Sequence, residues 1–140
     1  MEKIPTWQLV VAAALQREDG AWLMHRRSDH KHHGGLWEFP GGKVENGENP
    51  RVALARELRE ELDIEVSPSN CEAQFFAEEP ADERECPIVI LLYTLRIWTG
   101  APVALEGGAL DWFSLDQTRS LAKPPLDVEL AAKLFEKEQG

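Results

Sequence analysis

The sequence predicts an α/β fold of the sandwich kind, in which helices pack on a mixed β-sheet. Short apolar segments separated by turn signals predict the strands. One amphipathic helix interrupts these strands, and a second helix closes the chain, which favours helices packed on a sheet. With 140 residues, of which 43% are hydrophobic, the chain can bury one ordinary core, so we expect a single domain over residues 1–140.

The first part of the chain is expected to supply three strands. Residues 7–15 are apolar and predict a buried strand, and the turn at 18–20 leads into a second strand at 21–27. These two strands are expected to pair as a hairpin. Residues 36–39 predict a short third strand that ends at the Pro-Gly-Gly of residues 40–42.

A helix is predicted to begin at Pro50 and to run to about Leu62. Asn49 is a favourable N-cap residue, and proline is well tolerated at the first helical position. Leu54, Leu58 and Leu62 recur at helical spacing and form the expected core-facing row.

The second part of the chain is expected to supply three more strands and the closing helix. Residues 71–78 and 87–98 predict two strands, and the second is apolar enough to be central in the sheet. The acidic residues 79–85 between them predict a flexible loop. Residues 109–114 predict another strand, and residues 127–137 the last helix.

Composition excludes several classes of protein. The formal net charge of -10 argues against a nucleic acid polymer held by bulk charge, although a small phosphate substrate arriving with metal ions remains compatible with it. Cys71 and Cys86 form no CxxC pair and favour reduced thiols in a cytoplasmic protein. Residues 1–5 lack an apolar signal segment, and the longest apolar run, 88–95, is too short to span a membrane.

The predicted helix carries three carboxylates on one face. Glu57, Glu60 and Glu61 are spaced i, i+3 and i+4, so they are neighbours on the helix surface. Like charges at this spacing repel one another, and a divalent cation would offset that repulsion. Oxygen donors on a rigid element suit Mg²⁺ or Mn²⁺, so we expect one of these ions as cofactor.

The spacing of residues 42–64 resembles the Nudix box. The matching positions are Gly42, Glu48, Arg56, Glu57, Leu58, Glu60, Glu61 and Ile64. The resemblance implies the Nudix αβα sandwich and hydrolysis of a nucleoside diphosphate linked to another group. It also implies a catalytic set made of Glu57, Glu60, Glu61, Arg56 and Glu48.

The same resemblance implies how this set divides its work. The metal ligands would be Glu57, Glu60, Glu61 and the carbonyl group of Gly41. Arg56 would pair with a glutamate of the box, plausibly Glu48, and orient the metal site. Which glutamate acts as general base is left open.

Asp63 departs from the box, which usually has glycine at this position. The residue follows the helix, where a positive φ is common, and aspartate adopts that conformation more readily than most residues. We expect a cost of about 1 kcal/mol at most, with the metal site intact.

Residues 36–43 are similar to the LEFPGGK segment of the MutT branch of this family. The resemblance implies hydrolysis of nucleoside triphosphates, among them 8-oxo-dGTP, to the monophosphate and pyrophosphate; related members prefer CTP. It implies substrate contacts from Arg27, Phe39 and Asp127, and a late metal ligand in Glu106. Asp127 stands where MutT has a base-reading asparagine, and an ionised carboxylate accepts but does not donate hydrogen bonds.

Simpler structural roles compete with these assignments. Asp127 could cap the last helix, Phe39 could belong to the core, and Glu106 could be an ordinary loop acid. Trp37 and Trp112 are expected to pack rather than to stack on a base.

The histidines of the 28–35 segment are a further open point. His30, His32 and His33 resemble a metal cluster. Without cysteine or acidic partners at fixed spacing, however, a solvated loop is the favoured interpretation.

The leading hypothesis is therefore a Mg²⁺-dependent nucleoside triphosphate pyrophosphohydrolase that cleans the nucleotide pool. One alternative is a hydrolase of CTP or of another diphosphate compound such as ADP-ribose, and a non-enzymatic alternative is a nucleotide-sensing module. The expected partner is a small nucleotide, with no membrane and no nucleic acid polymer, and both a monomer and a homodimer remain open.

Overall fold

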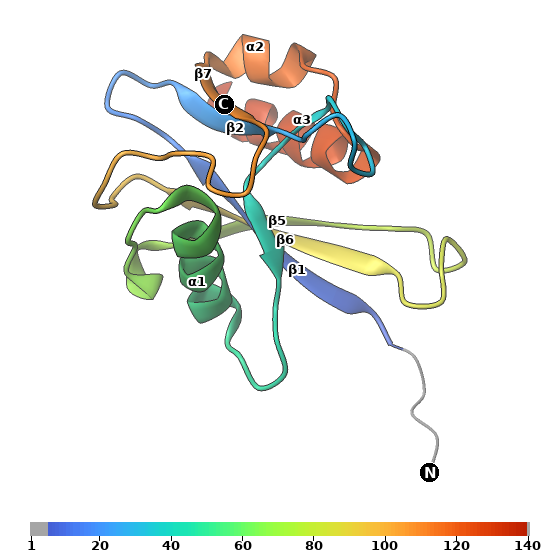
Figure 1. The fold of residues 1–140 in the computed structure, drawn as a ribbon. Coiled ribbons are helices and arrows are strands. Elements are labelled where there is room, and N and C mark those ends of the chain that lie inside the picture. Colours follow the sequence, from blue (N-terminus) through green and yellow to red (C-terminus); the bar gives the residue numbers. More distant parts are fainter. Residues whose placement is uncertain (1–5, 140) are drawn as a thin grey trace.

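The chain is built around a four-stranded sheet whose strand order is β4-β1-β6-β5 (Figure 1). The structure is a computed structural model, and it describes residues 6–139. The segment 1–5, which bears on the expected lack of a signal segment, lies outside the described residues. The strands of this sheet are β1 (Gln8–Leu15), β4 (Gly41–Lys43), β5 (Glu72–Glu78) and β6 (Ile88–Leu95).

The sheet is mixed, as the sequence predicts. β1 and β6 pair in parallel over their full length, from Gln8 opposite Ile88 to Leu15 opposite Leu95. The other two pairings, β1 with β4 and β5 with β6, are antiparallel. β6 therefore lies in the interior of the sheet, which confirms the central position expected from its apolar sequence.

The expected hairpin between the first two strands is wrong. β2 (Trp22–Arg26) lies instead in a second, antiparallel sheet of order β3-β2-β7, with β3 (Trp37–Glu38) and β7 (Ala109–Phe113). A single bridge between Gln16 and Trp22 is what joins it to the end of β1. The physical reason is that β6 occupies one edge of β1 along its full length and β4 occupies the other edge at residues 10–12, so β2 pairs only beyond the end of β1.

The helix α1 (Pro50–Leu62) forms as predicted. The side chain of Asn49 accepts a hydrogen bond from the N–H of Arg51 at 2.9 Å, and Pro50 opens the helix. The helix ends at Asp63, which adopts the left-handed conformation with φ 57° and ψ 39°. This is the conformation expected for a residue that replaces the usual glycine.

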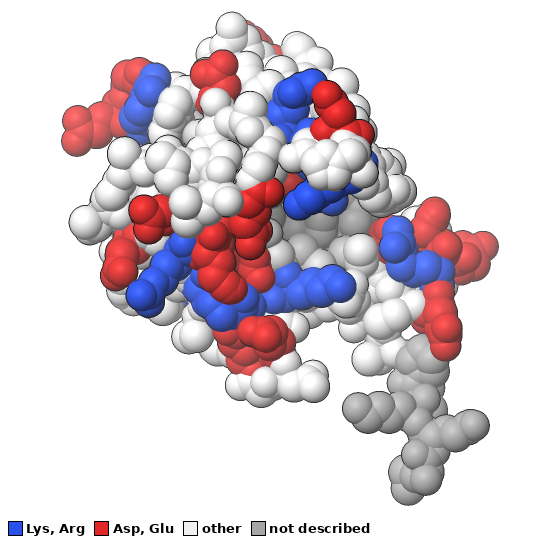
Figure 2. All heavy atoms as spheres, in the orientation of Figure 1, with Lys and Arg blue, Asp and Glu red and all other residues white. Residues whose placement is uncertain are grey.

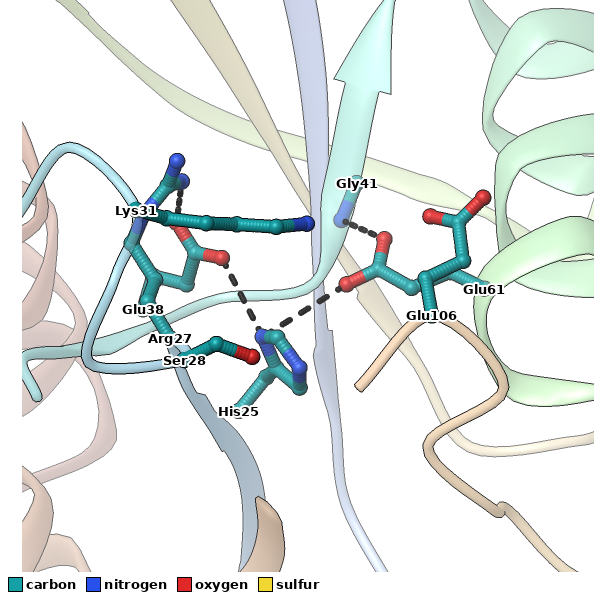
Figure 3. Close-up of a pocket in the computed structure, with 8 residues that line it drawn as sticks. All are labelled: His25, Arg27, Ser28, Lys31, Glu38, Gly41, Glu61 and Glu106. Atoms are coloured by element: carbon teal, nitrogen blue, oxygen red, sulfur yellow. Dashed lines mark hydrogen bonds and ion pairs between the residues drawn. The ribbon is translucent and has the colours of Figure 1, made fainter. Parts of the chain in front are cut away.

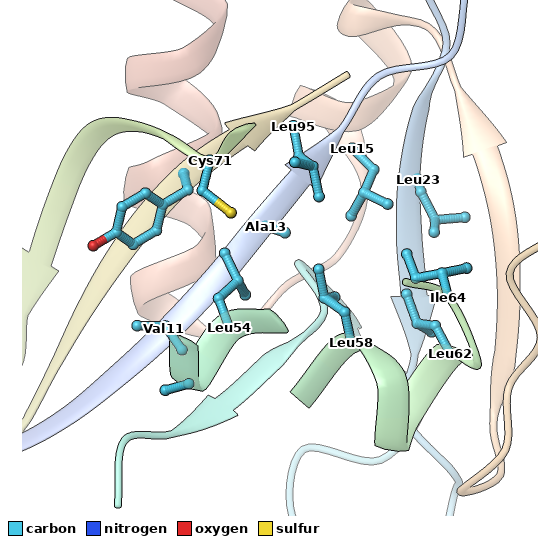
Figure 4. Packing of buried hydrophobic residues seen from close by; sticks show 12 residues of the cluster. Val11, Ala13, Leu15, Leu23, Leu54, Leu58, Leu62, Ile64, Cys71 and Leu95 are labelled. Atoms are coloured by element: carbon cyan, nitrogen blue, oxygen red, sulfur yellow. The ribbon is translucent and has the colours of Figure 1, made fainter. Parts of the chain in front are cut away.

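Helices cover both faces of the four-stranded sheet, which gives the expected sandwich. Val11, Ala13 and Leu15 of β1 pack on the side of α1, where Leu54, Leu58 and Leu62 are fully buried (Figure 4). The alternate residues of β1 pack on the opposite side, against α3 (Pro125–Gln139). Since successive residues of a strand point to opposite faces, β1 supplies both cores.

Three short elements were not expected from the sequence. β4 forms over the glycines that were expected only to end the preceding strand. A 3-10 turn, η1 (Pro68–Asn70), follows α1, and α2 (Leu115–Ser120) follows β7 with a capping box between Ser114 and Gln117. Within residues 6–139, no helix combines the length and the apolar character needed to cross a membrane.

Candidate active site

A pocket of about 130 Å³ lies where α1 faces the second sheet (Figure 3). It gathers side chains from β2, β3 and α1, from the N-terminal end of β4, and from the loops before β3 and β7. Its lining consists of His25, Arg27, Ser28, Lys31, Glu38, Gly41, Glu61 and Glu106. Four of the residues named from the sequence, at positions 27, 41, 61 and 106, therefore meet in one place.

Glu61 is the buried carboxylate of this pocket. Its residue is only 6% exposed, and its Oε2 accepts a hydrogen bond from the N–H of Gly41 at 3.3 Å. Burial raises the pKa of Glu61 to about 7, even though the nearby His25 lowers it. A carboxyl group with such a pKa exchanges protons near neutral pH, which suits a general base or a metal ligand.

Arg56 holds the outer glutamates together. Its Nε and Nη2 donate to the two oxygens of Glu48 at 2.8 and 3.0 Å, which confirms the expected pair. Its Nη1 also donates to Glu57 at 2.9 Å and to Glu60 at 3.0 Å. The hydrogen bonds from Arg56 lower the pKa of Glu48 to about 2, so this group stays ionised.

The glutamates of α1 do not all lead into the pocket. The carboxylate of Glu57 lies against Gly42, and an added methyl group there would displace this carboxylate from its present position. Glu60 is the most exposed of the three, with 46% of its side chain accessible, and it is engaged by Arg56. Of the three predicted ligands, Glu61 therefore lines the pocket. Glu57 lies beside the pocket, and Glu60 lies outside it.

The donors present fit a divalent cation. Burial raises the pKa of Glu57, and the negative charge of Glu106 raises the pKa values of both Glu57 and Glu61. Carboxylates from α1 and from the loop before β7 therefore act on one another as like charges, which a cation would relieve. Glu106 as a late metal ligand stays a prediction, and this electrostatic contact is compatible with it.

Four lining residues were missed by sequence reasoning, namely His25, Ser28, Lys31 and Glu38, and two of these contact each other. His25 in β2 and Glu38 in β3 face each other across the strand pair, with His25 Nδ1 3.2 Å from Oε2 of Glu38. The hydrogen bond to Glu38 raises the pKa of His25. Burial raises the pKa of Glu38, but the hydrogen bonds from His25 and Arg27 outweigh it and hold this pKa below its usual value. The available signal was weak: His25 directly follows the apolar residues 21–24, and Glu38 lies between Trp37 and Phe39.

A larger cleft of about 620 Å³ adjoins the pocket and shares Arg27 and Glu38 with it. Arg27 Nη1 donates to Glu38 Oε1 at 2.9 Å, so an ion pair separates the two spaces. Figure 2 shows basic and acidic side chains around the hollow of this face. The apolar part of the lining consists of Val10, Pro80, Ile88, Ile90, Pro124, Pro125 and Leu126.

Asp127 is one of the residues that line this cleft. It is the third residue of α3 and 6% exposed, and its Oδ2 accepts a hydrogen bond from the backbone N–H of Phe39 at 3.0 Å. The interpretation of Asp127 as a helix cap is therefore wrong, because its carboxylate ties α3 to the end of β3. Burial raises the pKa of Asp127 to about 7.

Phe39 and the loop with His30, His32 and His33 lie where the simpler structural interpretations place them. Phe39 is 4% exposed and packs in the core on the α3 side, which favours its structural interpretation, while its contact with a base stays a prediction. His30, His32 and His33 are exposed, as expected for a solvated loop. His32 and His33 nevertheless line the larger cleft.

Comparison with known proteins agrees with this geometry. The family model described as the NUDIX domain matches residues 6–136. The chain is 36% identical over 121 residues to a CTP pyrophosphohydrolase of Escherichia coli, covering 86% of each chain. It is 31% identical over 128 residues to an 8-oxo-dGTP diphosphatase of the same organism, covering 89% of this chain and 94% of the relative.

A solved structure has the same fold. The solution structure of the ORF135 protein of Escherichia coli superposes with a TM-score of 0.83 at 32% identity, over 96% of this chain and 92% of that one. The αβα sandwich, the acidic helix behind a glycine strand and the matched sequence all lead to one conclusion, which is that the chain belongs to the Nudix hydrolase family.

Proposed function

We propose that this Nudix hydrolase cleaves nucleoside triphosphates to a nucleoside monophosphate and pyrophosphate with the help of Mg²⁺ or Mn²⁺. The observation that carries the proposal is the pair of adjoining cavities that share Arg27 and Glu38. The small cavity is lined by charged groups, and the larger one has an apolar wall. A nucleotide has the same division, with charged phosphates at one end and an aromatic base at the other.

The phosphate end is assigned to the small pocket. Glu57, Glu60, Glu61, Glu106 and the Gly41 carbonyl are the proposed metal ligands, and bound Mg²⁺ would neutralise phosphate charge and lower the pKa of an attacking water. Lys31 lines the same pocket and supplies a cation that suits the phosphate oxygens.

Arg56 and Glu48 support this metal site from outside the pocket. Arg56 donates to Glu57, Glu60 and Glu48, so it holds the first two carboxylates in one arrangement before any metal binds. Such support of metal ligands is a common function of a buried or half-buried ion pair.

The nucleoside end is assigned to the larger cleft. Its apolar wall offers a surface on which a base can lie, and Asp127 offers an oxygen in the same lining. Arg27 stands between the two cavities, near the expected position of the first phosphate or the sugar. Phe39 supports the position of Asp127 through its backbone N–H.

The preferred base is a second part of the proposal. We propose CTP rather than 8-oxo-dGTP as the preferred substrate. The ionised form of Asp127 would accept a hydrogen bond from the amino group of the base, but cytosine and guanine both carry such a group, so this contact does not separate the two substrates. The 36% identity to a CTP pyrophosphohydrolase supports the choice of CTP. Hydrolysis of 8-oxo-dGTP remains the competing specificity, supported by the second relative.

Steady-state kinetics over a panel of nucleotides with Mg²⁺ tests both parts. We expect turnover of triphosphates with release of pyrophosphate, and a higher kcat/KM for CTP than for 8-oxo-dGTP. The variant Asp127→Asn, which introduces the asparagine of MutT, should move this ratio toward 8-oxo-dGTP. Fast turnover of ADP-ribose, together with neglect of every triphosphate, would contradict the proposal.

The wider setting follows from this activity. We propose that residues 1–140 act as one catalytic domain in the cytoplasm, where nucleoside triphosphates and Mg²⁺ occur together. The two free cysteines, Cys71 and Cys86, agree with a reducing compartment. A nucleotide-sensing module is the non-enzymatic alternative, and unchanged turnover in Glu61→Gln would favour it.

A further inference from the structure

One ring nitrogen of His25 is held by a backbone carbonyl. Its Nε2 lies 2.9 Å from the carbonyl oxygen of Gly107, which can only accept, so Nε2 carries the proton of this hydrogen bond. Gly108 lets the loop come this close, because an added methyl group there would collide with the carbonyl of Arg26 and crowd His25 Nε2. The loop therefore determines which ring nitrogen of His25 donates.

The other ring nitrogen faces two carboxylate oxygens. His25 Nδ1 lies 3.2 Å from Oε2 of Glu38 and 3.7 Å from Oε1 of Glu61, as the dashed lines in Figure 3 show. While Nδ1 is protonated, it donates to Glu38. When the ring is neutral with its proton on Nε2, Nδ1 presents a lone pair to these oxygens, and a cation can take the place of the lost proton. His25 is 8% and Glu61 6% exposed, so water screens the repulsion poorly and a cation between the three atoms would relieve it.

The separations of these atoms are close to those of metal ligands. Two ligand atoms that are each about 2.1 Å from a metal lie roughly 3 to 3.5 Å apart at right-angled or tetrahedral coordination. The three donor atoms of His25, Glu38 and Glu61 all lie within 4.8 Å of one another, so a small approach by Glu61 completes the set. A histidine that ligates through one nitrogen and donates from the other to a backbone carbonyl is common at protein metal sites.

We propose that His25, Glu38 and Glu61 form a second metal site, which takes a transition-metal ion of the Zn²⁺ kind. Its nitrogen ligand distinguishes it from the all-oxygen site proposed for Mg²⁺, because imidazole suits Zn²⁺ whereas Mg²⁺ prefers oxygen. The remaining coordination positions face the pocket, where water or a phosphate oxygen fills them.

Glu61 belongs to both sets of ligands. Zn²⁺ bound at His25 therefore withdraws Glu61 from the Mg²⁺ site, so the second site lowers Mg²⁺-dependent turnover. This consequence rests on the proposed function, whereas the binding of Zn²⁺ itself does not.

Calorimetric titration with Zn²⁺ tests the binding. The untagged chain is first stripped of metal ions and then titrated in a buffer that contains excess Mg²⁺. We expect a tight Zn²⁺ site in the wild type that weakens at least about tenfold in His25→Gln, which lacks the Nδ1 ligand. Glutamine keeps an amide donor near the position of Nε2, so the hydrogen bond to Gly107 can persist. His32→Gln, in the exposed loop, is the matched control and should bind Zn²⁺ as the wild type does.

Nitrogen NMR of the histidine rings gives a readout that needs no variant and no turnover. Addition of Zn²⁺ should shift the Nδ1 resonance of His25 strongly and leave Nε2 protonated. Equal Zn²⁺ affinity in wild type and His25→Gln would overturn the proposal. The proposal would also be overturned if Nδ1 of His25 were protonated in the metal-free protein and its resonance did not change on addition of Zn²⁺. In that case a proton, rather than a metal ion, would lie between the carboxylates. Nucleotide turnover with Mg²⁺, measured separately, decides the proposed function independently.

Discussion

The acidic side chains of the site occupy two environments that differ in what neutralises them. On the outer side, Arg56 donates to three carboxylates, those of Glu48, Glu57 and Glu60. On the inner side, Glu61 is buried next to His25, and burial outweighs its favourable contacts. Arg56 thus suffices to keep Glu48 ionised, whereas the buried carboxyl group of Glu61 calls for a proton or a metal ion. Structural support and chemistry are separated along one helix.

The largest expected effect distinguishes Glu61 from Glu60. The variant Glu61→Gln removes the buried carboxylate, and we expect kcat to fall by about 10²- to 10⁴-fold. Glu60→Gln changes an exposed group held by Arg56, and we expect a loss of less than about tenfold. Steady-state kinetics at saturating Mg²⁺ measures both, with thermal melting as the control for folding. Equal losses in the two variants would remove the distinction between the environments.

Arg56→Lys breaks the outer cluster without removing its positive charge. Lysine cannot donate two parallel hydrogen bonds to Glu48, so we expect kcat/KM to fall by about 10- to 100-fold through misplaced carboxylates. Arg59 lies on the same helix with its side chain 74% exposed, and Arg59→Lys is the matched control. Wild-type kinetics in Arg56→Lys would show that charge alone, rather than the paired geometry, orients the site.

The pH dependence of stability sharpens the contrast between buried and exposed carboxyl groups. Because the folded-state pKa values of Glu61 and Asp127 are raised to about 7 from 4.5 and 3.8, each group favours the folded state while it is protonated. This contribution is lost as the pH rises through about 7. Between about pH 5 and pH 8, we therefore expect the metal-free protein to lose about 1 to 3 kcal/mol of unfolding free energy.

Denaturant titrations at several pH values, with metal removed, measure this loss. Glu61→Gln and Asp127→Asn should each flatten the curve, and Mg²⁺ should restore stability at the higher pH. The contribution of Glu48 to stability depends on pH in the opposite direction, because its pKa is lowered to about 2. This contribution therefore disappears only in strong acid. A wild-type stability that does not change between these pH values would contradict the assignment.

The smallest expected effect concerns the end of α1. Asp63 has φ 57°, a conformation that glycine adopts without cost, so Asp63→Gly should change the unfolding free energy by less than about 1 kcal/mol. Turnover should stay at the wild-type level, since Asp63 lies outside both acidic environments. An increase in activity by orders of magnitude without a change in melting temperature would show that Asp63 disturbs the metal site.

Local signals predicted α1 well and the strand pairing poorly. Asn49, Pro50 and the leucine row act within a few residues of one another, so they determine where the helix begins and which face is buried. The partner of β1 is decided about 80 residues away, because Gln8 pairs with Ile88. A turn between two strands shows only that the chain reverses, and it does not say which edge is free.

The same limit explains the site residues that were found and missed. The box glutamates and Arg56 lie within one short segment, so the resemblance of that segment to the Nudix box was enough to predict the Arg56–Glu48 pair. His25 and Glu38 become neighbours through the register of β2 and β3, and Glu61 joins them only when α1 packs beside these strands. The spacing of residues in the sequence does not indicate that these three segments come together.

The wall shared by the two cavities bears on how such an enzyme can evolve. Arg27 and Glu38 line both spaces, so a substitution that adapts either of them to a new base also disturbs the phosphate end. Ile88, Ile90 and Leu126 line the larger cleft alone, and changes there leave the proposed metal ligands in place. Divergence toward new nucleotides is therefore expected to proceed through this apolar wall, while the ion pair persists across lineages that differ in substrate.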